Sequence, residues 1–142
     1  MSRVQLALRV SDLEGSIEFY RSLFGVEPAK RRPGYANFAI AEPPLKLVLI
    51  EGEPDRSTVL DHLGVEVATT DEVSAATARL SGLGLATLAE NDTTCCYALQ
   101  DKVWVHGPGD EPWEVYTVKA DAPEATSTRA DGGSGPCECG TA

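Results

Sequence analysis

The sequence predicts an α+β fold in which two tandem βαβββ modules form one curved sheet. Three observations support this class. Runs of alternating hydrophobicity are interrupted twice by a helical pattern, the same order of elements recurs after about 60 residues, and large apolar side chains vanish after Lys119. A period of this length is too long for a solenoid repeat, so it indicates a duplicated module.

The first module opens with an alternating strand pattern at residues 3–10. A helix is expected next, because Ser11 and Glu14 have the spacing of a capping box and Gly25 stands where a helix commonly ends. Its apolar residues recur at helical intervals, at Leu13, Ile17, Tyr20 and Phe24. Extended runs complete the module at residues 35–41 and 45–51, with the turn-prone sequence EPP between them.

The second module repeats this order over residues 62–119. Residues 62–69 have a strand pattern, and the spacing predicts a helix over 70–81 that ends at the sequence GLG. The inward stripe of this helix is expected at Val73, Ala76, Thr77 and Leu80. Three extended runs follow, at residues 85–90, 95–107 and 113–119.

The domain organisation follows from length and composition. A chain of 142 residues suggests one folded domain, expected at residues 1–119, with modules at about 1–52 and 60–119. Residues 120–142 are rich in Ala, Ser, Thr, Gly and Pro, so they are expected to form a flexible tail.

The charge and the termini exclude several classes of partner. A formal net charge of −10 argues against nucleic acid and anionic membranes. No signal peptide is apparent at the N-terminus, and no apolar run is long enough to span a bilayer. We therefore expect a cytoplasmic protein, in which thiols stay reduced.

Aligning the two modules brings polar residues into correspondence. Gln5 and His62 fall at equivalent points of the first strand of each module. Near the end of each module Lys46 aligns with Glu114, with a shift of one or two residues left open. A pseudo-twofold pairing of the modules would bring Gln5, His62 and Glu114 together around a shared cavity.

These three side chains form a candidate metal site. They offer an amide oxygen, an imidazole nitrogen and a carboxylate oxygen, which suit a divalent ion such as Fe(II), Mn(II) or Ni(II). Three ligands leave positions open for substrate or dioxygen, as in catalytic sites. Each residue alone also has a structural interpretation, as a core histidine, a hydrogen-bonded glutamine or a solvated glutamate. The other histidine, His106, enters a turn and is a weaker candidate.

Several segments resemble the vicinal oxygen chelate superfamily, which includes glyoxalase I, extradiol dioxygenases and bleomycin-resistance proteins. They are LALRVSDLEGSIEFYRSLFGVEP, DHLGVEV and GPGDEPWEVYTV, and the resemblance covers residues 3–119. It implies a glyoxalase-like fold with metal ligands on the first and last strands of each module. The three candidate ligands match three of those four positions, and the fourth, Lys46 or Val48, does not suit a metal. Extradiol dioxygenases use His, His and Glu, and here Gln5 replaces the first His.

The segment TCCYALQDKVWV resembles more closely the ArsI type of carbon–arsenic lyase. This resemblance implies cleavage of the carbon–arsenic bond of trivalent organoarsenicals, such as methylarsenite and aromatic arsenicals, to give arsenite. The cofactor would be Fe(II), for which Ni, Co or Mn can substitute in crystals, and dioxygen would be the co-substrate. Cys95 and Cys96 would bind the arsenic, since soft As(III) prefers thiolates.

Two adjacent cysteines can bind one arsenic atom only if the backbone between them is irregular. Successive side chains of a regular strand point to opposite faces, so Cys95 and Cys96 could not chelate one atom from ideal β geometry. We therefore expect residues 91–96 to form an irregular, mobile loop. Two alternatives remain for the cysteines: they are small buried apolar residues of the core, or they form a vicinal disulfide.

Lys102 has two interpretations. It either stabilises negative charge or pins the closed loop, or it is a solvated surface lysine. Four aromatic residues line the cavity or belong to the core: Tyr35, Phe38, Tyr97 and Trp104.

Other functions remain open from the sequence. One is a different non-haem iron dioxygenase of the extradiol type, acting on an arene. Another is a non-catalytic resistance protein that binds thiol-reactive metals or drugs. A second thiol pair, Cys137 and Cys139, either captures arsenic or contributes nothing to catalysis. The expected partner is a small organoarsenical, and the protein is expected to be a monomer or a homodimer.

Overall fold

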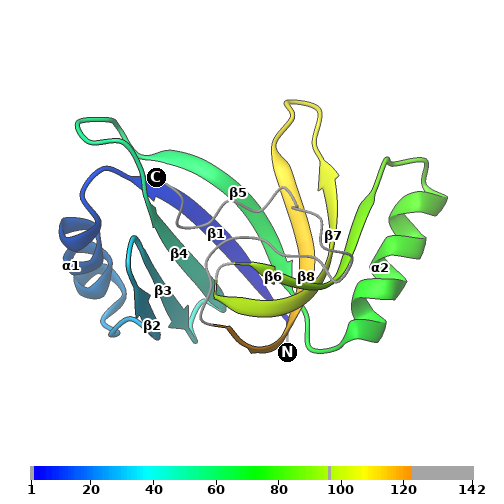
Figure 1. The fold of residues 1–142 in the computed structure, drawn as a ribbon, viewed down its shortest axis with the longest axis horizontal. Helices are drawn as coiled ribbons and strands as arrows, with labels where there is room; N and C mark the ends of the chain where they lie inside the picture. Colours follow the sequence, from blue (N-terminus) through cyan, green and yellow to red (C-terminus); the bar gives the residue numbers. More distant parts are fainter. Residues whose placement is uncertain (1, 96, 123–142) are drawn as a thin grey trace.

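A computed structural model describes residues 2–95 and 97–122 (Figure 1). These residues form two helices and eight strands in the order that two βαβββ modules require. The first module contains β1 (Arg3–Val10), α1 (Leu13–Phe24), β2 (Lys30–Arg32), β3 (Tyr35–Ile40) and β4 (Leu45–Glu51). The second contains β5 (Val59–Glu66), α2 (Thr70–Gly82), β6 (Leu88–Cys95), β7 (Ala98–His106) and β8 (Pro112–Asp121).

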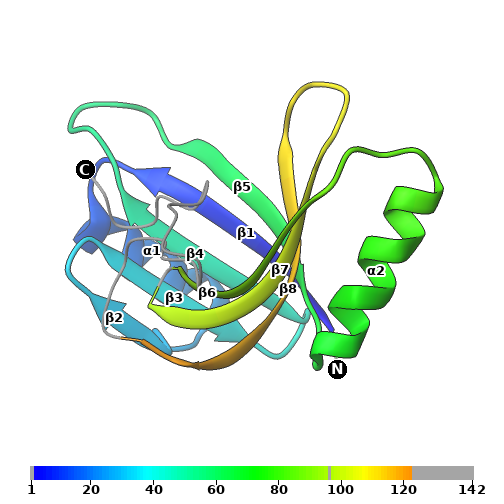
Figure 2. The same cartoon turned by 45° about the vertical axis from the view of Figure 1, so that its right-hand side comes forward.

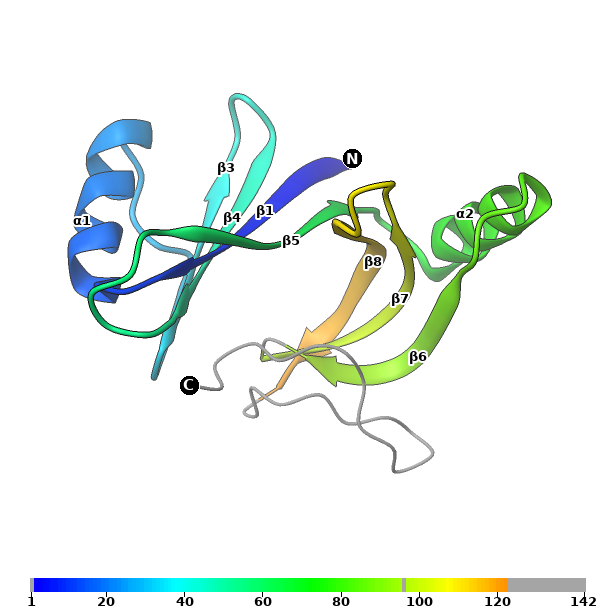
Figure 3. The same ribbon diagram turned by 90° about the horizontal axis from the view of Figure 1, so that it is seen from above.

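The eight strands form one mixed sheet in the order β2-β3-β4-β1-β5-β8-β7-β6. The two modules meet where β1 pairs antiparallel with β5, and each of these strands pairs parallel with the last strand of its own module. Seen from above, the sheet curls so that the strands of the two modules face each other across a concave side (Figure 3). This architecture confirms the predicted α+β fold class.

The helices lie at opposite ends of the sheet, outside the curl (Figures 1 and 2). In α1 the buried residues are Leu13 and Ile17, and both pack against apolar side chains of β3 and β4. In α2 the buried residues are Val73 and Ala76, and the other two residues of the predicted stripe, Thr77 and Leu80, are only partly buried. Because both helices cover the convex side, the concave side is left to side chains of the strands, which are apolar at Ala7 and Val48 of the first module and polar at His62 and Glu114 of the second.

Helix α1 begins at a different N-cap from the predicted one and ends where predicted. The expected capping box of Ser11 and Glu14 is wrong: Asp12 is the N-cap of α1, and its carboxylate accepts from the Gly15 amide at 2.9 Å. Asp12 is the residue directly before the helix and has the extended backbone that a cap needs. Gly25 ends α1 at a φ of 68°, which confirms the prediction there.

The expected loop over residues 91–96 is wrong for residues 91–95. These residues belong to β6 and pair with β7, with one register shift between Glu90 and Thr93. The irregular backbone lies at Asn91 and Asp92, which the β6–β7 ladder skips. Asp92 has a φ of 51°, and its amide donates to the buried Asp101 carboxylate at 2.7 Å. Pairing then resumes as far as Cys95. Cys96 lies outside the described residues.

The ends of the folded region extend slightly beyond the expected ones. β8 runs to Asp121, two residues past Lys119, and β5 begins at Val59. The predicted tail falls largely outside the described residues, as do Cys137 and Cys139. Within the part that the structure describes, no helix is long and apolar enough to cross a membrane.

Candidate metal centre

Three polar side chains from different strands meet on the concave face. Gln5 of β1, His62 of β5 and Glu114 of β8 are each only 3% exposed. The Gln5 Nε2 atom lies 2.9 Å from Glu114 Oε1 and 3.1 Å from His62 Nε2, and the His62 Nε2 atom lies 3.5 Å from Glu114 Oε1. The structure therefore brings together the three residues that the sequence analysis singled out.

The register of the sheet explains this convergence. Gln5 is paired with Gly64 across the β1–β5 ladder, and Gly64 is paired with Glu114 across the β5–β8 ladder. His62 is two residues from Gly64 and so points to the same face. A Cβ atom on Gly64 would lie 3.1 Å from both Gln5 Nε2 and Glu114 Cγ. The glycine therefore leaves the space into which the three side chains reach.

The same register decides between the two candidates for the fourth position. Ala7 pairs with Val48 in the first module as Gly64 pairs with Glu114 in the second. If Gln5 corresponds to His62, then Ala7 corresponds to Gly64 and Val48 corresponds to Glu114. The alignment of Lys46 with Glu114 is thus two residues out, a shift that keeps the same face. Val48 is 2% exposed and belongs to an apolar cluster, so the first module offers no fourth ligand here.

His62 is held in one tautomer by its neighbours. Its Nδ1 atom lies 2.6 Å from the Asp61 carboxylate, which also accepts from Arg9 Nε at 2.7 Å. The proton therefore sits on Nδ1, and Nε2 faces the site with its lone pair. Burial lowers the pKa of His62, but hydrogen bonds to Asp61 and Glu114 outweigh it and raise the pKa to about 9.

Glu114 is held as a carboxylate. Its Oε2 atom accepts from Lys102 Nζ at 2.8 Å, which leaves Oε1 directed at Gln5 and His62. Burial raises the pKa of Glu114, but the charges of Lys102 and His62 outweigh it and hold this pKa well below its usual range. The interpretation of Lys102 as a solvated surface lysine is wrong, because its side chain is only 1% exposed. Its ammonium group also lies 5.4 Å from the centre of the Trp104 ring.

Two residues of the site were missed by the sequence analysis. Tyr116 donates to Gln5 Oε1 at 2.5 Å, and burial raises the pKa of this phenol well above its usual value. Asp61 is the partner of His62 described above. Tyr116 lies two residues after Glu114 on the same strand, and Asp61 directly precedes His62. Both residues could therefore have been found from the sequence by their closeness to a predicted ligand.

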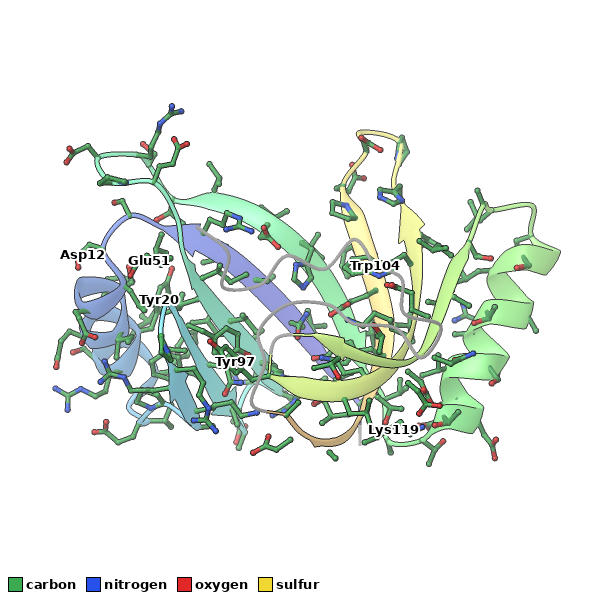
Figure 4. The ribbon with its side chains drawn as sticks, viewed as in Figure 1. Asp12, Tyr20, Glu51, Tyr97, Trp104 and Lys119 are labelled. Atoms are coloured by element: carbon green, nitrogen blue, oxygen red, sulfur yellow. The ribbon has the colours of Figure 1, made fainter. Side chains whose placement is uncertain are left out.

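The aromatic candidates divide between the site and the core. Trp104 packs edge-on against His62 with ring centres 5.5 Å apart, and its Nε1 donates to Glu90 at 2.8 Å. The side chain of Tyr97 extends from the second module toward the first (Figure 4). Its ring centre lies 5.2 Å from that of Tyr35. Phe38 belongs to the core under α1. His106 is exposed at the end of β7, away from the cluster.

The donor set fits a divalent ion. Two donors each about 2.1 Å from an ion and at right angles to each other lie about 3 Å apart, close to the 3.5 Å between His62 Nε2 and Glu114 Oε1. Among the described residues, no three His, Cys, Asp or Glu side chains gather at one point. The amide oxygen of Gln5 is the third candidate donor of this cluster. Its oxygen faces Tyr116 here, so ligation requires the amide to turn over. The space beside Gly64 and the direction of His62 Nε2, which faces Gln5 and Glu114, both favour an ion at this point.

A buried set of nitrogen and oxygen donors on paired βαβββ modules defines a class of metal-site proteins with the glyoxalase fold. The chain belongs to the Glyoxalase/Bleomycin resistance protein/Dioxygenase superfamily, whose family model matches residues 3–115.

Curated relatives cover most of the chain. A trivalent organoarsenical cleaving enzyme of Thermomonospora curvata is 72% identical over 86% of this chain and 81% of its own length. The cadmium-induced protein CadI of Mycobacterium bovis is 65% identical over 86% of this chain and 80% of its own length. A trivalent organoarsenical cleaving enzyme of Bacillus sp. strain MD1 is 42% identical over 87% of this chain and 78% of its own length.

Solved structures with low identity share the fold. A Mn(II)-bound glyoxalase from Novosphingobium aromaticivorans has a TM-score of 0.61 at 20% identity, covering 87% of this chain and 42% of that one. Homoprotocatechuate 2,3-dioxygenase from Arthrobacter globiformis has a TM-score of 0.59 at 22% identity, covering 83% and 36%. These likenesses support the fold class alone.

Proposed function

We propose that this protein cleaves the carbon–arsenic bond of trivalent organoarsenicals, such as methylarsenite and trivalent aromatic arsenicals, with release of arsenite. The observation that carries the proposal is the buried Gln5–His62–Glu114 cluster in a chain 72% identical to a trivalent organoarsenical cleaving enzyme. Fe(II) is the proposed resident ion, with Ni, Co or Mn as substitutes, and dioxygen is the proposed co-substrate. When bound, Fe(II) would supply the redox chemistry that activates dioxygen.

The protein's own side chains prepare the site for this chemistry. Asp61 keeps the His62 proton on Nδ1, so that Nε2 is available as a ligand. Lys102 neutralises one oxygen of Glu114 and leaves the other for the ion. Because Gln5, His62 and Lys102 are almost fully buried, water has little access behind the ligands.

Cys95 and Cys96 are the proposed substrate ligands. Their thiolates would hold As(III) and leave its organic substituent directed at the ion. Cys95 ends β6, and the turn that follows is tied to the first module, because Tyr97 donates to the Pro33 carbonyl at 3.2 Å and its own carbonyl accepts from Lys30 at 3.0 Å. Tyr97 also packs with Ala7 and Val48 of the first module, and Ala7 is two residues from Gln5 on β1. This contact supports the proposal that the neighbouring cysteines hold the substrate near the cluster.

The remaining expectations are part of the same proposal. We infer one functional domain with modules at about 1–52 and 60–121, because β8 continues to Asp121, two residues past the expected end of the domain at 119. A small organoarsenical is the expected partner, with no nucleic acid or membrane. The cytoplasm is the expected location, because the thiols must stay reduced to bind arsenic. The protein would act as a monomer or a homodimer.

The proposal is tested by turnover under controlled oxygen. The full chain is loaded anaerobically with Fe(II), mixed with methylarsenite and exposed to air, and arsenite is measured against time. We expect arsenite from the wild type and from the exposed control His106→Ala, and almost none from His62→Ala or from Cys95→Ser combined with Cys96→Ser. Equal arsenite in all four proteins would overturn the proposal.

A parallel assay separates the alternatives. An extradiol-type enzyme would consume oxygen with a catechol and would keep that activity when both cysteines are replaced. A non-catalytic binding protein would bind the arsenical tightly with no oxygen consumed, and His62 would be dispensable.

A further inference from the structure

The amide of Gln5 is turned the wrong way for a ligand. Its Nε2 atom faces Glu114 and His62, while its Oε1 atom accepts from the Tyr116 hydroxyl at 2.5 Å. An amide nitrogen carries no available lone pair for a cation, so Gln5 can bind an ion only through Oε1. Binding therefore requires the amide to rotate by about half a turn, which exchanges the places of its nitrogen and oxygen.

The rotation must leave the outgoing amide group satisfied. Gln5 is 3% exposed and Tyr116 is fully buried, so water does not reach either group freely. An NH₂ group left without an acceptor at this depth would destabilise the metal-bound form. The group that takes the place of Oε1 must therefore find an acceptor where a donor stood before.

Tyrosine is suited to this exchange because its hydroxyl both donates and accepts. We propose that Tyr116 is the positioning residue of the Gln5 amide: its hydroxyl donates to Oε1 in the metal-free protein and accepts from Nε2 when Gln5 turns its oxygen to an ion. This inference rests on the proposed metal site.

The surroundings of Tyr116 hold the hydroxyl in place during the exchange. The Lys46 ammonium group lies 5.3 Å from the centre of the Tyr116 ring, and that of Lys102 lies 5.9 Å from it. Tyr116 also lies two residues from Glu114 on β8, so the ring and the carboxylate share one face of one strand. The hydroxyl thus stays beside Gln5 while the amide turns.

Tyr35 provides a matched control. It is a second buried tyrosine, 1% exposed, whose hydroxyl accepts from Asn37 at 2.9 Å and has no described bond to Gln5. Replacing either tyrosine by phenylalanine removes one buried hydroxyl. Only the Tyr116 change removes the partner of the Gln5 amide.

The test is anaerobic titration of the full chain with Co(II), read by the dissociation constant and by visible absorption. Tyr116→Phe should weaken Co(II) binding about tenfold and alter the spectrum, whereas Tyr35→Phe should leave the dissociation constant within about twofold of wild type. In a Gln5→Ala background Tyr116→Phe should change neither quantity, because the residue through which it acts is gone.

Two outcomes would overturn the inference while leaving the metal site intact. One is wild-type Co(II) affinity and spectrum in Tyr116→Phe. The other is an equally large loss in the Gln5→Ala background, which would show that Tyr116 acts elsewhere. Failure of the wild type to bind one Co(II) per chain would instead overturn the metal site and the inference with it.

A measurement on the unmutated chain covers the case in which Tyr116→Phe does not fold. In the metal-free protein the Gln5 side-chain amide protons should show nuclear Overhauser contacts to the His62 ring. On loading with Zn(II) these contacts should disappear, and contacts to the Tyr116 ring should appear. Contacts to His62 that persist unchanged in the Zn(II)-loaded protein would contradict the rotation.

Discussion

The two modules share a backbone plan but present different chemistry to the concave face. On β8, Glu114 is a buried carboxylate bonded to Lys102 and Gln5. On β4, its register counterpart Val48 packs with apolar side chains, and its near neighbour Lys46 is a cation whose pKa burial lowers. One module therefore supplies most of the charged groups of the site, and the other supplies a mainly apolar wall and one amide.

This difference shows how a duplicated fold becomes a one-sided site. The β1–β4 and β5–β8 ladders have the same parallel pairing, so the backbone offers equivalent positions in both modules. A four-ligand site would need a donor at Val48. Its replacement by an aliphatic side chain leaves that side of the cluster free of a protein ligand, where a substrate could approach an ion.

The largest expected effect concerns charge on the last strand of each module. Glu114→Leu should lower the free energy of unfolding of the metal-free protein by about 3–5 kcal/mol, because Lys102 is left buried and unpaired. Lys46→Leu should cost about 1 kcal/mol or less, because Glu66 keeps its bond to Arg3. Urea denaturation measures both. Adding Lys102→Met to Glu114→Leu should restore much of the loss, and equal costs for the two single variants would contradict the comparison.

The second prediction compares the ligands on the first strand of each module. His62→Ala should reduce Fe(II) affinity and the rate of arsenite release by at least about 100-fold, because imidazole is the one nitrogen donor of the set. Gln5→Ala should reduce them by about tenfold, since an amide oxygen is a weaker donor that water can replace. Anaerobic Fe(II) titration and arsenite measurement distinguish the two. A greater loss for Gln5→Ala would reverse the assignment.

The third prediction tests the hydrogen bond by which Asp61 holds the His62 ring in the second module. Asp61→Asn should weaken Fe(II) binding by about 10–100-fold, because the His62 tautomer is no longer held by a carboxylate. Asp55→Asn, at an exposed residue outside the site, is the control and should bind as the wild type does. Titration with Fe(II) gives both values, and unchanged affinity in Asp61→Asn would mean that the hydrogen bond is not needed.

The smallest expected effect is at the paired small residues. Gly64→Ala should weaken metal binding by about fivefold to tenfold, because its Cβ would press on Gln5 and Glu114. Ala7→Gly, the corresponding change in the first module, should leave metal affinity unchanged and cost about 1 kcal/mol of stability. Co(II) affinity and urea unfolding separate these effects. Weaker binding in Ala7→Gly than in Gly64→Ala would show that the space beside Gly64 is not where the ion sits.

Local sequence patterns predict most of the helices and strands of this protein. The alternation in Arg3–Val10, the helical spacing after Asp12 and their recurrence in the second module predict the elements, because each depends on neighbours within a few residues. The pairing of Gln5 with His62 as equivalent positions also came from this repeat. The N-cap at Asp12 and the bulge at Asp92 were missed, since each depends on one side-chain hydrogen bond.

The sequence by itself therefore determined the two-module plan and the three candidate ligands, through periodicity and repetition. Only the tertiary structure decided that Gln5, His62 and Glu114 meet, that Lys102 is buried against Glu114, and that Tyr116 bonds the Gln5 amide. The physical reason is the register across the β1–β5 and β5–β8 ladders, where a slip of one residue would turn each side chain to the opposite face. Register depends on contacts between residues far apart in the chain, and local sequence patterns do not carry it.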